Sequence, residues 1–475
     1  MPIVDKFNVD GQDYSIEPVL DAVPMQNSQH AVMSGGVFAD KSDVPVQGST
    51  KNFTAAGAYD FFDGSKASKS WLGKVFGHLL GRKWQRVVTA NSYCAAYGKG
   101  VWVLGCATLG GLWSEDGTHW EQCTSLPANK PVYEVLYADD IFVAWVGDVG
   151  LYWSEDGKDW TLCTGTFNTT SKFLSYANGM WFCTGQSSGL YWSEDGKVWA
   201  QATGDISTSS IYRANGVIYA NGIYVCGAST STNFGAFWSE DGKAWTRATG
   251  GTGSVSWLTH LNGIWLAANG VGSSSNAGII WSEDGKSWSA GTTSYSGADG
   301  YSVGNIVYGN GVFVAPALAA GSGSIGCLWS EDGKAWSQCT GITTYNITIT
   351  AYGVAYADGI WVCGLNGYGV AWSNNGKDWT VGTAPETDLS GFRYANGIWL
   401  CKGAGRKAIL YSLDGMVWNL SSANVDWEVN GVKNFIAYAA GVWLAISTAG
   451  CYCSSIEQLI EEGAITDENI PRVQG

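Results

Sequence analysis

The chain has little charge and little proline. Charged residues fill 14% of its 475 positions, against about 25% in an ordinary soluble domain. Nine residues are proline, and the 65 glycines follow no three-residue period, which excludes a collagen-like chain. Hydrophobic residues make up 45% and aromatic residues 13%, which excludes disorder. A helical bundle is excluded as well, because glycine and aromatic residues replace the usual alanine, leucine, glutamate and lysine.

Basic residues and long apolar runs are also scarce. Twenty-six Lys and Arg stand against 41 Asp and Glu, a net charge of −15, which argues against non-specific binding of nucleic acid. No stretch of about 18 apolar residues predicts a membrane span. The first 15 residues lack the apolar core of a secretory signal. We therefore expect a protein that stays in the cell or leaves it without a signal, for example when virions are released by lysis.

What the sequence has in abundance is a repeat. The pattern Trp-Ser-Glu-Asp-Gly-x-x-Trp, altered in some copies, begins at Trp113, Trp153, Trp192, Trp238, Trp281, Trp329, Trp372 and Tyr411. Successive copies start 39 to 48 residues apart, and a second pattern, Tyr-Ala-Asn-Gly-Ile-Trp, alternates with them. A period near 40 with turn signals inside it is typical of the blades of a β-propeller. The expected fold class is therefore all-β, a β-propeller.

Each repeat predicts four short antiparallel strands, here called A to D. In the repeat at 163–199, Asn-Gly at 178–179 joins strands A and B, and Asp-Gly at 195–196 joins strands C and D. Both dipeptides favour two-residue hairpin turns. If Asp-Gly is the whole C–D turn, Trp192 faces Trp199 across the hairpin, and the preceding glutamate faces the following lysine. We expect such tryptophan pairs on one face of most blades.

The turn aspartates are predicted to be structural. Aspartate tolerates turn geometry and hydrogen-bonds the local backbone, and this role is expected for Asp116, Asp156, Asp195, Asp241, Asp284, Asp332 and Asp414. The same carboxylates could suggest Ca²⁺ sites, which is the less favoured interpretation. The chain has four histidines and no clustered pair, which argues against zinc. We expect no metal and no cofactor.

The two ends of the repeat region predict how the ring closes. A strand-D tryptophan occurs nine times, and the first, Trp84, precedes any strand A, whereas the last repeat ends near Cys451 without a strand D. Pairing these two strands closes a ring of about nine four-stranded blades by a strand swap and removes exposed sheet edges. The predicted domains are an N-terminal attachment segment at 1–50, a linker with an amphipathic helix at 51–83, the propeller at 84–455, and a C-terminal helix and tail at 456–475.

The two rims of the predicted ring differ. The A–B and C–D turns are short and nearly invariant, whereas the B–C loops and D–A connections, on the opposite rim, vary in length and sequence. Variable loops on a regular scaffold are where ligand contacts concentrate. Candidate ligand-binding residues on this variable rim are Phe167, Phe234, Trp257, Tyr295, Tyr345, Tyr368, Arg393 and Trp427.

The sequence argues against both catalysis and a disulfide framework. A glycosidase needs two carboxylates facing a cleft, and the variable segments offer Glu386 with Asp388, and Asp426 with Glu428. Spacing alone is weak support, so we expect no enzyme. Most of the twelve cysteines recur at repeat positions that elsewhere hold Ala, Leu or Gly. We therefore expect buried packing thiols rather than a disulfide framework.

The segment before the repeats is basic and amphipathic. Residues 64–86 carry six Lys and Arg and no acid, and apolar residues recur at helical spacing as Trp71, Leu72, Val75, Phe76, Leu79 and Leu80. The predicted helix packs on the propeller or on copies of itself, docks on a membrane surface, or binds an acidic partner. At the other end, residues 455–462 predict a short helix.

Two resemblances follow from these motifs. The unit Trp-Ser-Glu-Asp-Gly-Lys-x-Trp resembles the Asp-box of sialidase-like and sortilin-like propellers, but is one residue shorter between Asp and Gly. In that family the box is a structural hairpin, so the resemblance implies a scaffold role. The family's F-R-I-P motif is missing and Arg is scarce, with seven in the chain, so sialidase activity is not expected.

Residues 27–39, NSQHAVMSGGVFA, resemble a segment near the start of tail-fibre and related tail proteins of bacteriophages. The resemblance implies a virion tail protein, made in the host cytoplasm and acting outside the cell. Its N-terminus would bind other tail proteins, and its propeller would bind a host-surface glycan or other receptor. We expect no nucleic-acid partner, and we expect the chain to form homo-oligomers, such as a trimer. The alternatives are a glycan-degrading tail enzyme and a purely structural tail or baseplate component.

Overall fold

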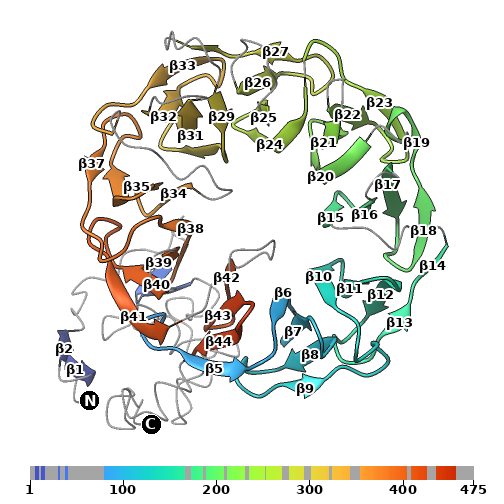
Figure 1. The fold of residues 1–475 in the computed structure, drawn as a ribbon, viewed down its shortest axis with the longest axis horizontal. Helices are drawn as coiled ribbons and strands as arrows, with labels where there is room; N and C mark the ends of the chain where they lie inside the picture. The colour runs from blue at the N-terminus through green and yellow to red at the C-terminus, as the bar shows by residue number, and fades with distance from the viewer. Residues whose placement is uncertain are drawn as a thin grey trace.

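The protein is a closed ring of nine blades, each built on four antiparallel strands (Figure 1). The structure, a computed structural model, describes residues 6–9, 12–15, 30–32, 38–40, 80–165, 173–185, 189–207, 211–230, 235–251, 253–269, 278–293, 301–319, 324–342, 353–403, 408–424 and 435–455. Strand A lies innermost in every blade and strand D outermost. The predicted fold class and blade number are confirmed.

The blades follow one another in chain order. Blades 1 to 3 consist of β6 (Ser92–Gly98), β7 (Val101–Cys106), β8 (Gly111–Ser114) and β9 (Glu121–Gln122); β10 (Val132–Ala138), β11 (Ile141–Val146), β12 (Gly150–Ser154) and β13 (Thr161–Leu162); and β15 (Phe173–Ala177), β16 (Met180–Gly185), β17 (Gly189–Ser193) and β18 (Val198–Gln201). Blades 4 and 5 consist of β20 (Ile211–Ala220), β21 (Ile223–Thr230), β22 (Ala236–Ser239) and β23 (Ala244–Arg247); and β24 (Val255–Leu261), β25 (Ile264–Asn269), β26 (Ile279–Ser282) and β27 (Ser289–Ala290).

The second half of the ring repeats this order. Blades 6 and 7 consist of β29 (Tyr301–Val303) with β30 (Val307–Gly309), β31 (Val312–Ala319), β32 (Ser324–Ser330) and β33 (Ala335–Gln338); and β34 (Val354–Ala357), β35 (Ile360–Leu365), β36 (Gly369–Ser373) and β37 (Thr380–Val381). Blades 8 and 9 consist of β38 (Ser390–Ala395), β39 (Ile398–Gly403), β40 (Ala408–Ser412) and β41 (Asn419–Asn424); and β42 (Phe435–Ala439), β43 (Val442–Ser447), β44 (Gly450–Ser454) and β5 (Gln85–Val88). Before the ring, β1 (Lys6–Val9) pairs with β2 (Gln12–Ser15), and β3 (His30–Val32) with β4 (Phe38–Asp40).

Blade 9 is completed by the two ends of the ring. Strand β5 pairs antiparallel with β44, with Val88 opposite Cys451, as the count of strand-D tryptophans predicts. In blade 9 the residues of the C–D turn come from the two ends of the repeat region, and the Gly81 N–H donates to the Ser454 hydroxyl at 2.8 Å. In blade 3 the same bond, from Gly196 to Ser193, lies inside one continuous turn. The closure thus reproduces the repeat's own hydrogen bonding.

The A–B turns have the predicted two-residue geometry. In blade 3 both turn residues have positive φ, 45° at Asn178 and 80° at Gly179, as a type I′ hairpin requires. The corresponding pair has positive φ in every blade, including Asp139-Asp140 and Ala440-Gly441. Asn-Gly is therefore the common solution and not an obligatory one.

The C–D turns are longer than predicted, and this corrects the expected tryptophan pairing. Strand β17 ends at Ser193 and β18 begins at Val198, so four residues form the turn. Trp192 is paired with Ala200, not with Trp199. A shift of one residue moves a side chain to the other face of the sheet. The two tryptophans therefore lie on opposite faces of the blade.

The core consists of layers between neighbouring blades. Trp199, 2% exposed, belongs to the cluster of blades 2 and 3, whereas Trp192 packs against the cluster of blades 3 and 4. Each of blades 1 to 6 thus uses one tryptophan toward each neighbour. All twelve cysteines are free and buried, as the packing interpretation predicts.

A belt of backbone bonds joins the outer strands. After strand D, the chain pairs in parallel with the strand D of the next blade, as where Thr164 N–H donates to the Lys197 carbonyl at 2.9 Å. Equivalent bonds join blades 1 to 8 in succession, and Ser422 N–H donates to the Arg82 carbonyl at 2.8 Å to join blades 8 and 9. This belt ties the blades together at the rim that carries the C–D turns.

Candidate functional site: a uniform rim and a variable rim

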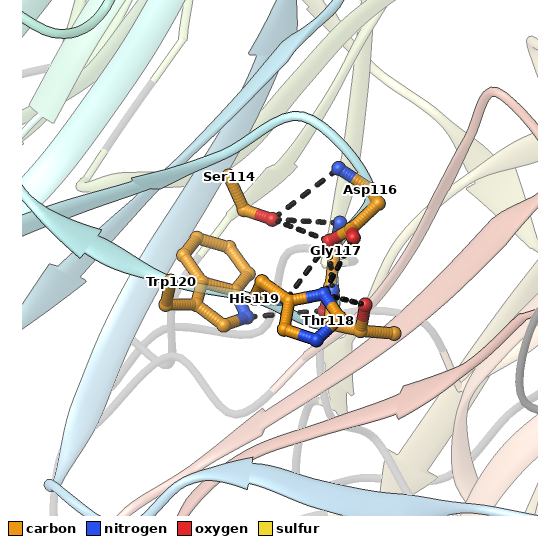
Figure 2. A network of polar contacts seen from close by, with 6 residues as sticks. All are labelled: Ser114, Asp116, Gly117, Thr118, His119 and Trp120. Carbon is orange, nitrogen blue, oxygen red and sulfur yellow. Dashed lines mark hydrogen bonds and ion pairs between the residues drawn. The ribbon is translucent and has the colours of Figure 1, made fainter.

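The uniform rim is built by a polar turn that each of blades 1 to 8 repeats. Figure 2 shows it in blade 1, where the Ser114 hydroxyl accepts from the Gly117 N–H at 2.8 Å and donates to the Asp116 carboxylate at 3.0 Å. The same carboxylate accepts from the backbone N–H groups of Thr118 and His119 at 2.7 and 2.9 Å. The Trp120 indole N–H donates to the Gly117 carbonyl at 3.0 Å. Serine and aspartate thereby satisfy donors that a plain hairpin would leave to water.

The other turn aspartates bind in the same way. Asp195 accepts from Lys197 and Val198 N–H at 2.8 and 2.9 Å, and Asn375 does the same in blade 7. Burial alone would raise the pKa of Asp195, but the two backbone N–H groups and the Ser193 hydroxyl outweigh it and lower the pKa. In each of these turns one carboxylate oxygen, Oδ1, accepts the bonds that hold the turn, which confirms the structural role of the carboxylate.

Glycine is required in this turn for space as well as conformation. Gly196 has a φ of +70°, and a Cβ there would lie 2.7 Å from Ile141 Cδ1 of the preceding blade. The turn therefore sits directly on the neighbouring blade.

Six junctions between blades carry a further contact, which we call the inter-blade clasp. It consists of a glutamate and a tryptophan of one blade and a lysine of the next, as Glu194, Trp192 and Lys243 show. The Lys243 Nζ lies 2.6 Å from Glu194 Oε1 and 4.5 Å from the centre of the Trp192 ring. The six lysines are Lys158, Lys197, Lys243, Lys286, Lys334 and Lys377. The expected contact of glutamate and lysine within one hairpin is thus wrong, because the longer turn directs them to different blades.

The clasp is a structural device of modest strength. The glutamates are 66–72% exposed, so each ion pair contributes about 0–1 kcal/mol, and the cation–π contact adds about 0.5–1 kcal/mol. Where blade 8 has Met416 in place of the lysine, blade 7 has Asn374 in place of the glutamate. Both partners change together, as expected of residues that act as a pair.

Between blades 7 and 8 the variable rim presents an exposed tyrosine on a hydrogen-bonded loop. Tyr368, in the loop between β35 and β36, is 60% exposed and is the most exposed large hydrophobic side chain in the described part of the chain. Asp388, in the connection to blade 8, has a φ of +56° and accepts from the Gly367 N–H at 2.8 Å. Its other oxygen accepts from the Thr387 hydroxyl. Asp388 thus fixes the loop that presents Tyr368.

Three charged residues belong to the connection into blade 8 and to its first two strands. Glu386 is 5% exposed, and its Cβ packs against Gly403 of β39. Beside Gly403, burial lowers the pKa of the half-buried Lys402. Arg393, in β38, donates from its guanidinium to the carbonyl of Phe392. Of the two carboxylates that the sequence offers here, Asp388 thus holds the loop, whereas Glu386 is buried.

The remaining predicted contacts divide into two groups. Trp257 lies in β24, half-buried against the cluster of blades 5 and 6, so its replacement would also disturb packing. Outside the described residues lie Phe167, Phe234, Tyr295, Tyr345 and Trp427. The predicted helices at 51–83 and 455–462 also lie there, apart from their residues 80–83 and 455, as do Asp426 and Glu428.

The described residues offer neither a metal-binding cluster nor a membrane-spanning helix. They hold no group of three or more His, Cys, Asp or Glu side chains suited to a metal ion. They also hold no helix long and apolar enough to cross a membrane.

Comparisons with known proteins identify no family. No family model matches the chain, and no curated protein matches it either. Among solved structures, it is similar to Sqt1 of Saccharomyces cerevisiae at 7% identity, with 78% of this chain and 97% of that chain covered and a TM-score of 0.46. YCF48 from Cyanidioschyzon merolae matches at 12% identity, 80% and 100% coverage and a TM-score of 0.39. The GH74 xyloglucanase from Xanthomonas campestris matches at 14% identity, 79% and 70% coverage and a TM-score of 0.29.

All these TM-scores lie below 0.5, so the function has to be argued from the residues of the ring. A propeller with one uniform and one variable rim is consistent with a binding or scaffold role.

Proposed function

We propose that the chain is a bacteriophage tail protein whose ring binds a host-surface glycan or other receptor through its variable rim. The observation that carries this proposal is the asymmetry of the rims. On the uniform rim of blades 1 to 8 the same serine, glycine and tryptophan recur, with aspartate or, in blade 7, asparagine between serine and glycine, because each of these blades needs the same turn. On the variable rim no such demand exists, and an exposed tyrosine stands on a fixed loop there.

The chemistry of Tyr368 supports a sugar ligand. An aromatic ring that is 60% exposed presents a flat apolar face, and Tyr combines that face with a polar hydroxyl. The Asp388 bonds to the loop reduce the ordering cost of binding. Several weak contacts of this kind around one rim, or in several copies of the chain, would combine into strong attachment.

The N-terminal segment supports the tail assignment. Its resemblance to tail proteins covers residues 27–39, which include the β3 strand and part of β4. In this proposal residues 1–50 attach to other tail proteins and the ring faces the host.

A glycan array with the full chain tests the proposal, read together with binding to intact host cells and with release of reducing sugar. We expect binding to a defined glycan class and no release of sugar. Sugar release would replace the binding role by an enzymatic one. Failure to bind any glycan or host cell, with virion assembly still dependent on the protein, would leave a structural tail component.

A further inference from the structure

The outer hairpin of blade 8 carries apolar residues at three exposed positions, whereas each hairpin of blades 1 to 7 has a polar residue at one or more of them. Where blade 3 has Glu194 and Gln201, blade 8 has Leu413 and Leu420. Leu413 is 49% and Leu420 41% exposed, and Val417, between them, is 49% exposed. Three exposed apolar side chains therefore follow one another on a single hairpin.

The surface continues onto blade 7. The Met416 carbonyl accepts from the Thr383 N–H at 3.0 Å, which places the outer edge of blade 7 beside this hairpin. Two residues before Thr383, Val381 is 39% exposed. We call Val381, Leu413, Val417 and Leu420 the apolar patch. It spans the one junction among blades 1 to 8 where neither charge of the clasp is present, since Asn374 and Met416 take the two positions.

The N-terminal chain enters the ring beside this patch. Leu80 is fully buried, and a Cβ on Gly81 would lie 2.7 Å from Leu400 of blade 8. The Arg82 guanidinium lies 5.1 Å from the centre of the Tyr411 ring, and its carbonyl accepts from Ser422 N–H. Leu413 occupies the glutamate position of the clasp, and Arg82 the lysine position. At the six complete clasps these positions lie in contact, with N–O distances of 2.5–3.1 Å.

The segment that precedes Leu80 contains apolar residues that could cover an apolar surface. Its apolar stripe consists of Trp71, Leu72, Val75, Phe76 and Leu79, and residues 64–79 contain no acid. A helix over residues 70–79 is about 15 Å long at 1.5 Å per residue. An isolated helix of this length is marginal in water and needs a packing partner.

We propose that residues 70–79 form a helix that docks with its apolar stripe on the apolar patch of blades 7 and 8. Docking covers the exposed leucines and valines and fixes the segment before Leu80 to the ring at the point where the ring closes. This inference goes beyond receptor binding and does not depend on it.

Tryptic cleavage after Lys74, followed by mass spectrometry of the full chain, tests the docking. The variant L413E/L420Q gives blade 8 the residues of blade 3 and supplies Arg82 with an opposite charge, so the ring is expected to stay folded. Cleavage after Lys74 should be at least about tenfold faster in this variant than in the unaltered protein. The matched control is L162Q, which alters the equivalent strand-D leucine of blade 2, 47% exposed, and should leave the cleavage rate unchanged.

A second variant approaches the contact from the helix side. W71Q/F76Q leaves the ring untouched and should speed cleavage after Lys74 by a similar factor, with faster hydrogen exchange over residues 70–79. Equal cleavage rates in the unaltered protein and L413E/L420Q, with circular dichroism showing both folded, would overturn the proposal. A dimer that dissociates on L413E/L420Q substitution while Lys74 stays protected would also overturn it, because a second copy would then cover the patch.

Discussion

The opposite orientation of the two tryptophans of a blade leads to unequal and independent stability effects. Trp199 is 2% exposed between blades 2 and 3, so W199A should cost about 3–5 kcal/mol of unfolding free energy. Trp192 is only half-buried and contacts Lys243, so W192A should cost about 1–2 kcal/mol, from lost packing and the lost cation–π contact.

Double-mutant cycles measure whether the two side chains touch. Residues without shared contacts have effects that add within about 0.5 kcal/mol, so W192A and W199F should be additive. The pair W192A and K243M should instead couple by about 0.5–1 kcal/mol. Met is the matched replacement, because blade 8 has Met416 at this position.

Urea unfolding followed by far-ultraviolet circular dichroism is the assay, since it does not depend on the altered indoles. An unchanged dependence on urea in each variant shows that the extent of unfolding is the same. Coupling of 1 kcal/mol or more between positions 192 and 199, or none between 192 and 243, would refute the assignment of the two tryptophans to different faces.

Three further outcomes follow from the closure, the thiols and the turn carboxylates. S454A removes the hydroxyl that accepts from the Gly81 N–H and should lower the unfolding free energy by about 1–2 kcal/mol. Deletion of residues 80–88 opens blade 9 and should destabilise the protein far more than deletion of residues 1–60. If the protein tolerates both deletions equally well, the ring is not closed by this strand. Burial raises the pKa of Cys163 to about 12, so native thiols should alkylate slowly, and disulfides in the denatured protein, seen by mass spectrometry without reductant, would contradict the packing role. The fold lowers the pKa of the turn aspartates, so the stability that these carboxylates give the folded protein is complete above about pH 4 and is lost as the pH falls below it. Replacing Asp195 with Asn, as in blade 7, should reduce this acid sensitivity in thermal melts. An unchanged pH profile would show that the carboxylate is not the sensitive group.

The sequence predicts the ring because its signals are local. Asn-Gly at 178–179 specifies a type I′ turn by itself, and the spare strand at Trp84 requires a partner at the other end of the repeats. Both outcomes are confirmed by the strand pairing. The C–D hairpin register could not be predicted in this way, because Ser193 and Asp195 lengthen the turn by bonding backbone N–H groups inside it.

The clasp could not be predicted from one repeat either. Lys243 lies 49 residues from Glu194, and a single hairpin offers it a nearer glutamate in its own turn, Glu240. Only the twist and spacing of neighbouring blades decide which partner it meets. The paired replacement by Asn374 and Met416 is the signal in the sequence that could have revealed the contact. For the variable rim, the sequence indicates where contacts concentrate and not how each side chain points, as half-buried Trp257 and exposed Tyr368 illustrate.

The assignment of the two rims is tested most directly by host-cell attachment of the full chain, measured alongside its melting temperature. Replacing Tyr295, Tyr345 and Tyr368 by Ala should abolish attachment with little change in melting temperature, since Tyr368 is 60% exposed. Replacing Asp156 and Asp195 by Ala should lower the melting temperature and leave attachment of the folded protein intact. The account is contradicted if attachment survives the tyrosine substitutions and is lost in the aspartate variant while its ring remains folded.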